Sequence, residues 1–149
     1  LYCQTRQMRQ DIRGEDVATV LLRKQSGLTV TCNMSYASHW ELDCFPQTMV
    51  AVEGTLGGVS LGRDYQLMHF GDGQTKCEQI AIDEYAWANP EYMLVHSSMV
   101  DCHRNLLAGL RGEMPAETTG ADNLRTLELV HACYDSAADG RVVHIDSHT

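Results

Sequence analysis

The side chains best suited to chemistry in this chain lie close together in one short segment. Tyr36, His39, Trp40 and Glu41 bring a phenol, an imidazole, an indole and a carboxylate within six residues. Groups that hydrogen-bond hydroxyls beside an aromatic face suit a polyol or a sugar. Loops also carry binding residues more often than other segments do. The alternative is an exposed loop in which Trp40 only packs on a sheet edge.

Seven histidines raise the question of a metal site. His96 and His103 fall on one face of a predicted helix, but they lie two turns apart, about 10 Å along the helix axis. That distance is too long for both side chains to bind one ion. The sequence has no His-Glu-x-x-His motif and no Cys/His cluster. We therefore expect no metal site, and histidines that serve the surface or the packing.

Cysteines offer a second kind of reactive group, but their pattern argues against catalysis. No pair has the Cys-x-x-Cys spacing, and a nucleophilic thiol needs a base and an electropositive setting that the sequence does not supply. Cysteine on an apolar face acts as a small hydrophobe. We expect reduced thiols in a cytoplasmic protein and no catalytic residue in this chain. The six cysteines are Cys3, Cys32, Cys44, Cys77, Cys102 and Cys133.

Composition excludes several classes of partner. The 149 residues carry a formal net charge of −9, and their 11 Lys and Arg residues are scattered, which argues against nucleic acid. No run approaches the roughly 18 apolar residues of a membrane span. The first residues are not a charged segment followed by an apolar one, so we expect no secretory signal among them. The chain begins at Leu1, and we expect a piece excised from a longer protein.

The first half of the chain reads as a series of short strands. An apolar run over residues 17–24 and a strictly alternating run over 28–36 flank the turn Gln25-Ser26-Gly27, which predicts a hairpin. Further strands are predicted over residues 48–53, 59–61, 65–70 and 75–82, with a tight turn at 71–73. This spacing is typical of a mainly antiparallel sheet.

The second half changes to a helical period. Asn89 and Thr119 are predicted to cap two helices, and Gly112 and Gly140 to follow their ends. A last strand is predicted over residues 142–145. Strands followed by helices indicate an α+β fold: one domain over residues 1–149, an open antiparallel sheet with helices on one face. The predicted core stripes are Val95, Met99, Cys102, Leu106 and Leu110, then Leu124, Leu127, Val130, Tyr134 and Ala137.

Short motifs from Glu15 to Arg141 resemble one known family. Their order and spacing are similar to those of the C-terminal domain of the glucose–fructose oxidoreductase / inositol dehydrogenase / MocA family. In chain order they are Glu15-Asp16-Val17-Ala18, Ser26-Gly27-Leu28, Val52-Glu53-Gly54-Thr55-Leu56-Gly57-Gly58, Pro115-Ala116-Glu117-Thr118-Thr119-Gly120-Ala121-Asp122, Leu127-Glu128-Leu129-Val130, Tyr134-Asp135-Ser136-Ala137 and Gly140-Arg141.

The resemblance implies a two-domain parent protein. Its N-terminal Rossmann half would bind NAD or NADP, and hydride would pass between the nicotinamide and a sugar, a polyol or a related carbonyl or alcohol. Its second half would complete the substrate pocket and mediate homo-oligomerisation. The resemblance also implies that the strand ending at Tyr36 lies near that pocket.

The family motifs that carry the chemistry are missing here. The sequence has no Gly-x-Gly-x-x-Gly, no Glu-Lys-Pro and no Asp-x-x-x-His in the place that the family requires. We therefore assign no catalytic, cofactor-binding or metal residue, and expect the isolated chain to be inactive. Two alternatives stay open: a small ligand-binding protein built around residues 36–40, and a non-catalytic module that dimerises through its open sheet face, where Val50, Val52, Val59 and Leu61 lie.

Overall fold

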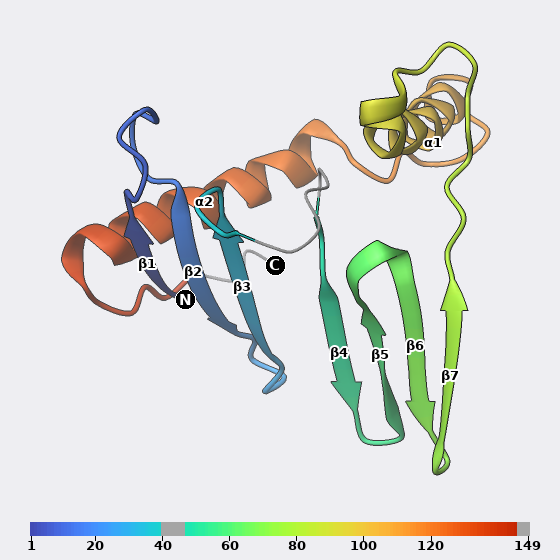
Figure 1. The fold of residues 1–149 in the computed structure, drawn as a ribbon. Coiled ribbons are helices and arrows are strands. Elements are labelled where there is room, and N and C mark those ends of the chain that lie inside the picture. The colour runs from blue at the N-terminus through green and yellow to red at the C-terminus, as the bar shows by residue number, and fades with distance from the viewer. Residues whose placement is uncertain (40–46, 146–149) are drawn as a thin grey trace. The chain divides into compact units, whose positions relative to one another are not determined.

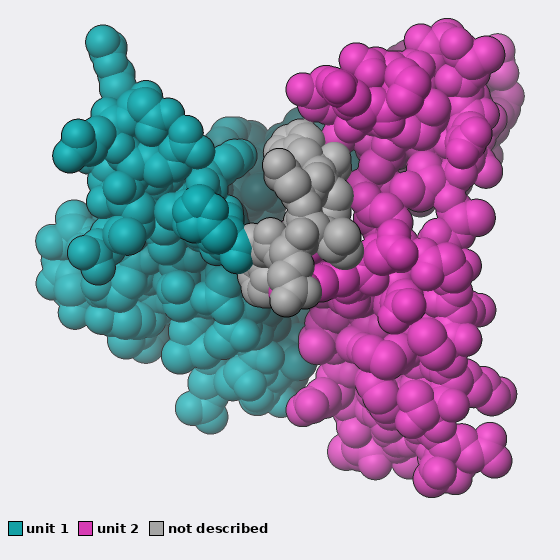
Figure 2. Space-filling model, in the orientation of Figure 1, with its two compact units in different colours: residues 1–41, 118–149 teal, residues 42–117 magenta. Residues whose placement is uncertain are grey.

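The computed structural model describes residues 1–39 and 47–145. It confirms the α+β class with antiparallel strands. The chain divides into two compact units, one of residues 1–41 and 118–149 and the other of residues 42–117 (Figure 2). The sequence predicts one open sheet, whereas the described strands pair as two separate sheets, one in each unit.

The first unit contains a three-stranded antiparallel sheet in the order β1-β2-β3 (Figure 1). Its strands are β1 (Tyr2–Arg6), β2 (Val17–Arg23) and β3 (Thr29–Ser35). The predicted hairpin is confirmed as β2–β3, and Lys24 donates its N–H to the carbonyl of Leu28 at 2.8 Å across the turn. Gly27 has φ +89°, a conformation that favours glycine.

Helix α2 (Gly120–Asp139) packs on one face of this sheet, as Figure 1 shows. Both predicted ends are confirmed. Thr119 and Asp122 form a capping box, and Gly140 closes the helix with φ +64°. The buried hydrophobic residues are Cys3, Val20 and Ala132, so the described core of this unit is the contact of α2 with β1 and β2.

The side of α2 that meets the sheet is not the predicted one. Leu124 is 62% exposed, and Leu127, Val130 and Tyr134 are exposed too, while Ala132 and Ser136 are buried. The predicted core stripe on α2 is therefore wrong for this chain. Small side chains let a helix approach a sheet closely, and they contribute little to an apolar periodicity.

The second unit contains a four-stranded antiparallel sheet in the order β4-β5-β6-β7. A short 3-10 turn, η1 (Arg63–Tyr65), precedes the third of these strands. The strands agree with the predicted series, although the last is shorter than predicted. They are β4 (Val50–Gly54), β5 (Gly57–Leu61), β6 (Gln66–Gly71) and β7 (Gln74–Gln79).

Helix α1 (Met93–Leu110) follows a 3-10 turn, η2 (Pro90–Tyr92), against which it packs. The predicted cap is confirmed, because the Asn89 side chain accepts the N–H of Glu91 at 3.0 Å. The predicted stripe of α1 is exposed at Met99, Leu106 and Leu110. Neither α1 nor α2 combines the length and the apolarity that a membrane span requires.

The last predicted strand is not formed as a strand. Residues 142–145 contain no assigned strand, and Val143 instead exchanges two backbone hydrogen bonds of 2.8 Å with Leu1. One such pair beside the start of β1 is too short for a ladder.

The exposed area of the chain is large for its mass. The chain has 16.6 kDa and exposes 12171 Å². Two separate globules of half that mass would together expose only about 9,100 Å². Apolar side chains contribute to the exposed area in both units, among them Leu124 in the first and Val52 in the second.

Candidate functional site

The candidate site is the end of the three-stranded sheet at which β1 ends, β2 begins and β3 ends. The register places Arg6, Val17 and Ser35 side by side there. Two segments leave the sheet at this end: residues 7–15, which Asp16 joins to β2, and residues 36–39 after β3. Connecting segments at the end of a sheet often carry binding residues.

Tyr36 and His39 are the two predicted site residues that the structure describes. Tyr36 donates its main-chain N–H to the carbonyl of Asp16 at 2.9 Å, and its side chain is 70% exposed. His39 is exposed three residues further on. Trp40 and Glu41 lie outside the described residues. A binding role for these four side chains stays a prediction.

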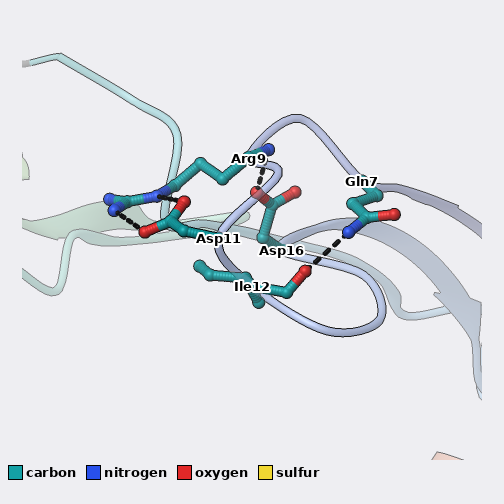
Figure 3. Close-up of polar contacts among 5 residues, drawn as sticks. All are labelled: Gln7, Arg9, Asp11, Ile12 and Asp16. Carbon is teal, nitrogen blue, oxygen red and sulfur yellow. Dashed lines mark hydrogen bonds and ion pairs between the residues drawn. The ribbon is translucent and has the colours of Figure 1, made fainter.

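Asp16 organises this end of the sheet. Its carboxylate accepts the main-chain N–H of Met8 and of Arg9, both at 2.7 Å. Figure 3 shows the bond from Arg9. Its own N–H donates to the carbonyl of Arg6 at 3.1 Å. The residue is only 4% exposed, so these bonds satisfy a carboxylate that the fold removes from water. Asp16 thus fixes the 7–15 segment and, through its carbonyl, the start of the segment that holds Tyr36.

The sequence offers only a weak signal for this role of Asp16. The residue appears there as part of the Glu15-Asp16-Val17-Ala18 motif. An acidic residue directly before an apolar strand could have suggested a partner among nearby backbone N–H groups. The partners lie seven and eight residues upstream, beyond the reach of any helix or turn rule.

Arg9 and Asp11 form an ion pair on the surface of the 7–15 segment (Figure 3). The guanidinium Nε lies 3.1 Å from one carboxylate oxygen of Asp11, and a terminal nitrogen lies 2.6 Å from the other. The hydrogen bond from Arg9 lowers the pKa of Asp11, and the same bond raises the pKa of Arg9. Both side chains are exposed, so the pair orients the segment and adds little stability.

Glu15 joins the same segment to α2. The Tyr134 hydroxyl donates a hydrogen bond to the Glu15 carboxylate. This bond lowers the pKa of Glu15 and raises the pKa of Tyr134. The Tyr134 ring belongs to the predicted core stripe, yet here it carries a polar contact at the surface of the first unit.

Histidine has packing roles where the structure gives it partners. His96 accepts the N–H of Asn89 through Nδ1 at 3.1 Å, and its ring stacks on Trp87 with the ring centroids 5.6 Å apart. His69 Nε2 on β6 lies 3.6 Å from a carboxylate oxygen of Glu78 on β7. Within residues 1–39 and 47–145, no three His, Cys, Asp or Glu residues are grouped to hold a metal ion.

Comparison with known proteins gives two similar sequences. A D-apiose dehydrogenase of Paraburkholderia graminis is 43% identical over 137 residues, which are 91% of this chain and 36% of that protein. A D-apiose dehydrogenase of Rhizobium rhizogenes is 34% identical over 145 residues, 97% of this chain and 42% of that protein. The chain thus spans about two fifths of the length of these relatives. No protein-family model matches the chain.

Solved structures agree with the sequence comparison. An oxidoreductase of Agrobacterium radiobacter, solved in complex with NAD+, L-tartaric acid and magnesium, superposes with a TM-score of 0.90 at 33% identity, over 95% of this chain and 42% of that one. A more distant Thermotoga maritima structure, at 14% identity and a TM-score of 0.72 over 97% of this chain and 39% of that one, shares the fold. These likenesses confirm the resemblance that the ordered motifs indicate: the chain is similar to the C-terminal domain of the glucose–fructose oxidoreductase / inositol dehydrogenase / MocA family.

Proposed function

We propose that this chain is the substrate-binding part of an NAD-dependent dehydrogenase that acts on a sugar or a related polyol. The observation that carries this proposal is the 43% identity with a D-apiose dehydrogenase over 91% of the chain. The likeness to a structure that contains NAD+ supports the choice of cofactor for the whole protein. NADP stays a possible cofactor for the parent.

Among residues 1–39 and 47–145, the helix starts are poorly suited to a dinucleotide. A pyrophosphate needs open N–H groups at the start of a helix. At α2 the Thr119 hydroxyl accepts the N–H of Asp122, and the Asp122 carboxylate adds a negative charge there. At η2, before α1, the Asn89 side chain takes the N–H of Glu91. We therefore assign no hydride-transfer step to this chain and expect it alone to bind no NADH.

The part that this chain would play is to hold the hydroxyl groups of the substrate. Tyr36 and His39 offer an exposed phenol and an imidazole at the end of the sheet, and Trp40 and Glu41 follow them in sequence. Asp16 holds the main chain of Tyr36 in place. Groups held by a rigid scaffold bind a polyol with less loss of freedom than groups on a loose loop.

A chimeric enzyme tests the proposal. The 137 matching residues of the Paraburkholderia graminis dehydrogenase are replaced with those of this chain, and NADH formation from D-apiose and other sugars is measured by absorbance. We expect a folded chimera that oxidises at least one sugar. A chimera that folds and binds NADH but oxidises none would contradict the proposal. The chain alone, titrated with NADH and followed by fluorescence, serves as the control and should show no binding.

A second candidate function is a non-catalytic module that dimerises through a sheet face. In the four-stranded sheet, Val52 pairs with Val59 and Val50 with Leu61, so these side chains share one face. The three valines are exposed, and an open antiparallel sheet with an apolar face needs cover. The excess of exposed area also favours association.

Sedimentation at increasing concentration tests the dimer proposal. The dimer proposal predicts a dimer that Val52→Lys disrupts. Ala51→Lys, its neighbour on the opposite face of β4, is the matched control and should leave the dimer intact. A chain that stays monomeric at high concentration would contradict the proposal.

We also propose a cytoplasmic setting, which the free thiols of Cys3, Cys32, Cys77, Cys102 and Cys133 support.

A further inference from the structure

Two cysteines of the first unit lie where α2 packs on the sheet, and a third is exposed on β3. Cys3 on β1 and Cys32 on β3 both lie opposite Val20 of β2, so their side chains share the face on which α2 packs. Cys133 belongs to α2. All three are free thiols.

Cys3 meets α2 within one helical turn of Cys133. Cys3 donates its main-chain N–H to the Ser136 hydroxyl at 2.9 Å, and Ser136 lies three residues after Cys133, so both side chains lie on one face of the helix. Cys3 is 1% exposed, whereas Cys133 is partly accessible.

The other pairings are unfavourable. Cys3 and Cys32 flank one residue of the central strand, so their Cα atoms lie two strand spacings apart, about 10 Å. A disulfide needs Cα atoms within about 7 Å. Cys32 also raises the pKa of the Cys133 thiol, but less than Cys3 does. Cys77 and Cys102 belong to the second unit.

We propose that Cys3 and Cys133 form a redox-modification site, at which a low-molecular-weight disulfide such as oxidised glutathione converts the two thiols into one intrachain disulfide. The Cys133 thiolate, the more accessible one, attacks a sulfur of the small disulfide and releases one thiol. The Cys3 thiolate then attacks the Cys133 sulfur of the mixed disulfide and releases the second. Two protein thiols are oxidised, one small disulfide is reduced to two thiols, and no other reactant is consumed.

The environment of Cys133 makes this reaction slow at neutral pH. Burial raises the pKa of the Cys133 thiol, and the contacts with Cys3 raise it further. Because only the thiolate attacks, the rate should rise with pH until the raised pKa is passed. A disulfide between Cys3 and Cys133 would join β1 to α2, which are far apart in the sequence. It would therefore restrict the unfolded chain and raise the melting temperature.

Peptide mapping of the full chain tests the site. The protein is incubated with excess oxidised glutathione, its remaining thiols are alkylated, and the digest is analysed by mass spectrometry. We expect the mass of the chain to fall by about 2 Da. The digest should contain one pair of peptides joined through Cys3 and Cys133, and the melting temperature should rise until dithiothreitol reverses the change. Cys32→Ser should leave all three results unchanged, and Cys133→Ser should abolish them.

Two outcomes would overturn the proposal. One is a wild-type digest in which Cys3 is alkylated while Cys133 carries glutathione. The other is a disulfide that joins Cys133 to Cys32. Both are read from the wild-type chain, so the test stands even if a substitution at the buried Cys3 prevents folding.

Discussion

The main-chain carbonyl of Asp16 accepts the N–H of Tyr36 at 2.9 Å, while the carboxylate of the same Asp16 holds two N–H groups of the preceding segment. One residue thus joins the end of β3 to the connection between β1 and β2. The segment with the predicted binding residues begins at that joint. The stability of the sheet end and the geometry of the candidate site therefore depend on the same side chain.

Replacing Asp16 with Ala should destabilise the first unit. The change removes the carboxylate that accepts hydrogen bonds from the N–H groups of Met8 and Arg9. We expect the free energy of unfolding to fall by about 3 kcal/mol. Urea denaturation followed by circular dichroism measures the loss. Asp11→Asn on the exposed surface is the control, with an expected effect under about 0.5 kcal/mol. Equal effects of the two substitutions would contradict the role of Asp16.

The bond between Tyr134 and Glu15 should stabilise the chain only above acidic pH. The bond lowers the pKa of Glu15 from its ordinary 4.5. The folded state then binds a proton less readily than the unfolded one, so the stabilisation is present above pH 4.5 and is lost as the pH falls through the lowered pKa. Tyr134→Phe should therefore lower the melting temperature at pH 6.5 and leave it unchanged near pH 2. Tyr36→Phe, an exposed tyrosine, should change it at neither pH. A pH-independent effect of Tyr134→Phe would show that packing of the ring, and not the hydrogen bond, is responsible.

Features that depend on neighbouring residues could be predicted from the sequence. The turn at Gly27, the caps at Asn89 and Thr119 and the end at Gly140 lie where the local pattern places them. Each depends on hydrogen bonds within a few residues, or on a backbone conformation that glycine adopts without strain. Strand β3 lies within the predicted alternating run, although all seven of its residues are exposed.

Features that depend on distant partners could not be predicted in this way. The apolar stripe with Leu124 is the stronger periodic signal on α2, but Ala132 and Ser136 meet the sheet. Cys3 on the first strand determines that contact through its hydrogen bond to Ser136, and no helical period contains it. For the candidate site, the sequence indicated Tyr36 and His39 but not Asp16, because the partners of Asp16 are backbone groups of another segment.

Substitutions in the candidate site should weaken substrate binding in the chimeric enzyme. Tyr36→Phe and His39→Gln remove or change groups that would bond substrate hydroxyls, and loss of one such bond corresponds to about a tenfold rise in KM. No residue of this chain is assigned to the chemical step, so kcat should change little. Steady-state kinetics with a varied sugar concentration measures both constants. Ser38→Ala, between the two residues, is the control. A large fall in kcat with unchanged KM would contradict a binding role.

Ser136→Ala should destabilise the chain although it removes only one oxygen atom. The Ser136 side chain is fully buried, accepts the N–H of Cys3 at 2.9 Å and donates to the carbonyl of Arg141 at 2.7 Å. Alanine leaves the N–H of Cys3 and the carbonyl of Arg141 without the hydroxyl at the contact of α2 with the sheet. We expect the free energy of unfolding to fall by about 2 kcal/mol. Thermal and urea unfolding measure it. Ala138→Ser is the matched control, because it adds a hydroxyl at an exposed position of the same helix, where the change should stay within about 0.5 kcal/mol. If Ser136→Ala proves neutral, the hydroxyl is not what holds α2 on β1, and the small size of the side chain alone explains its burial.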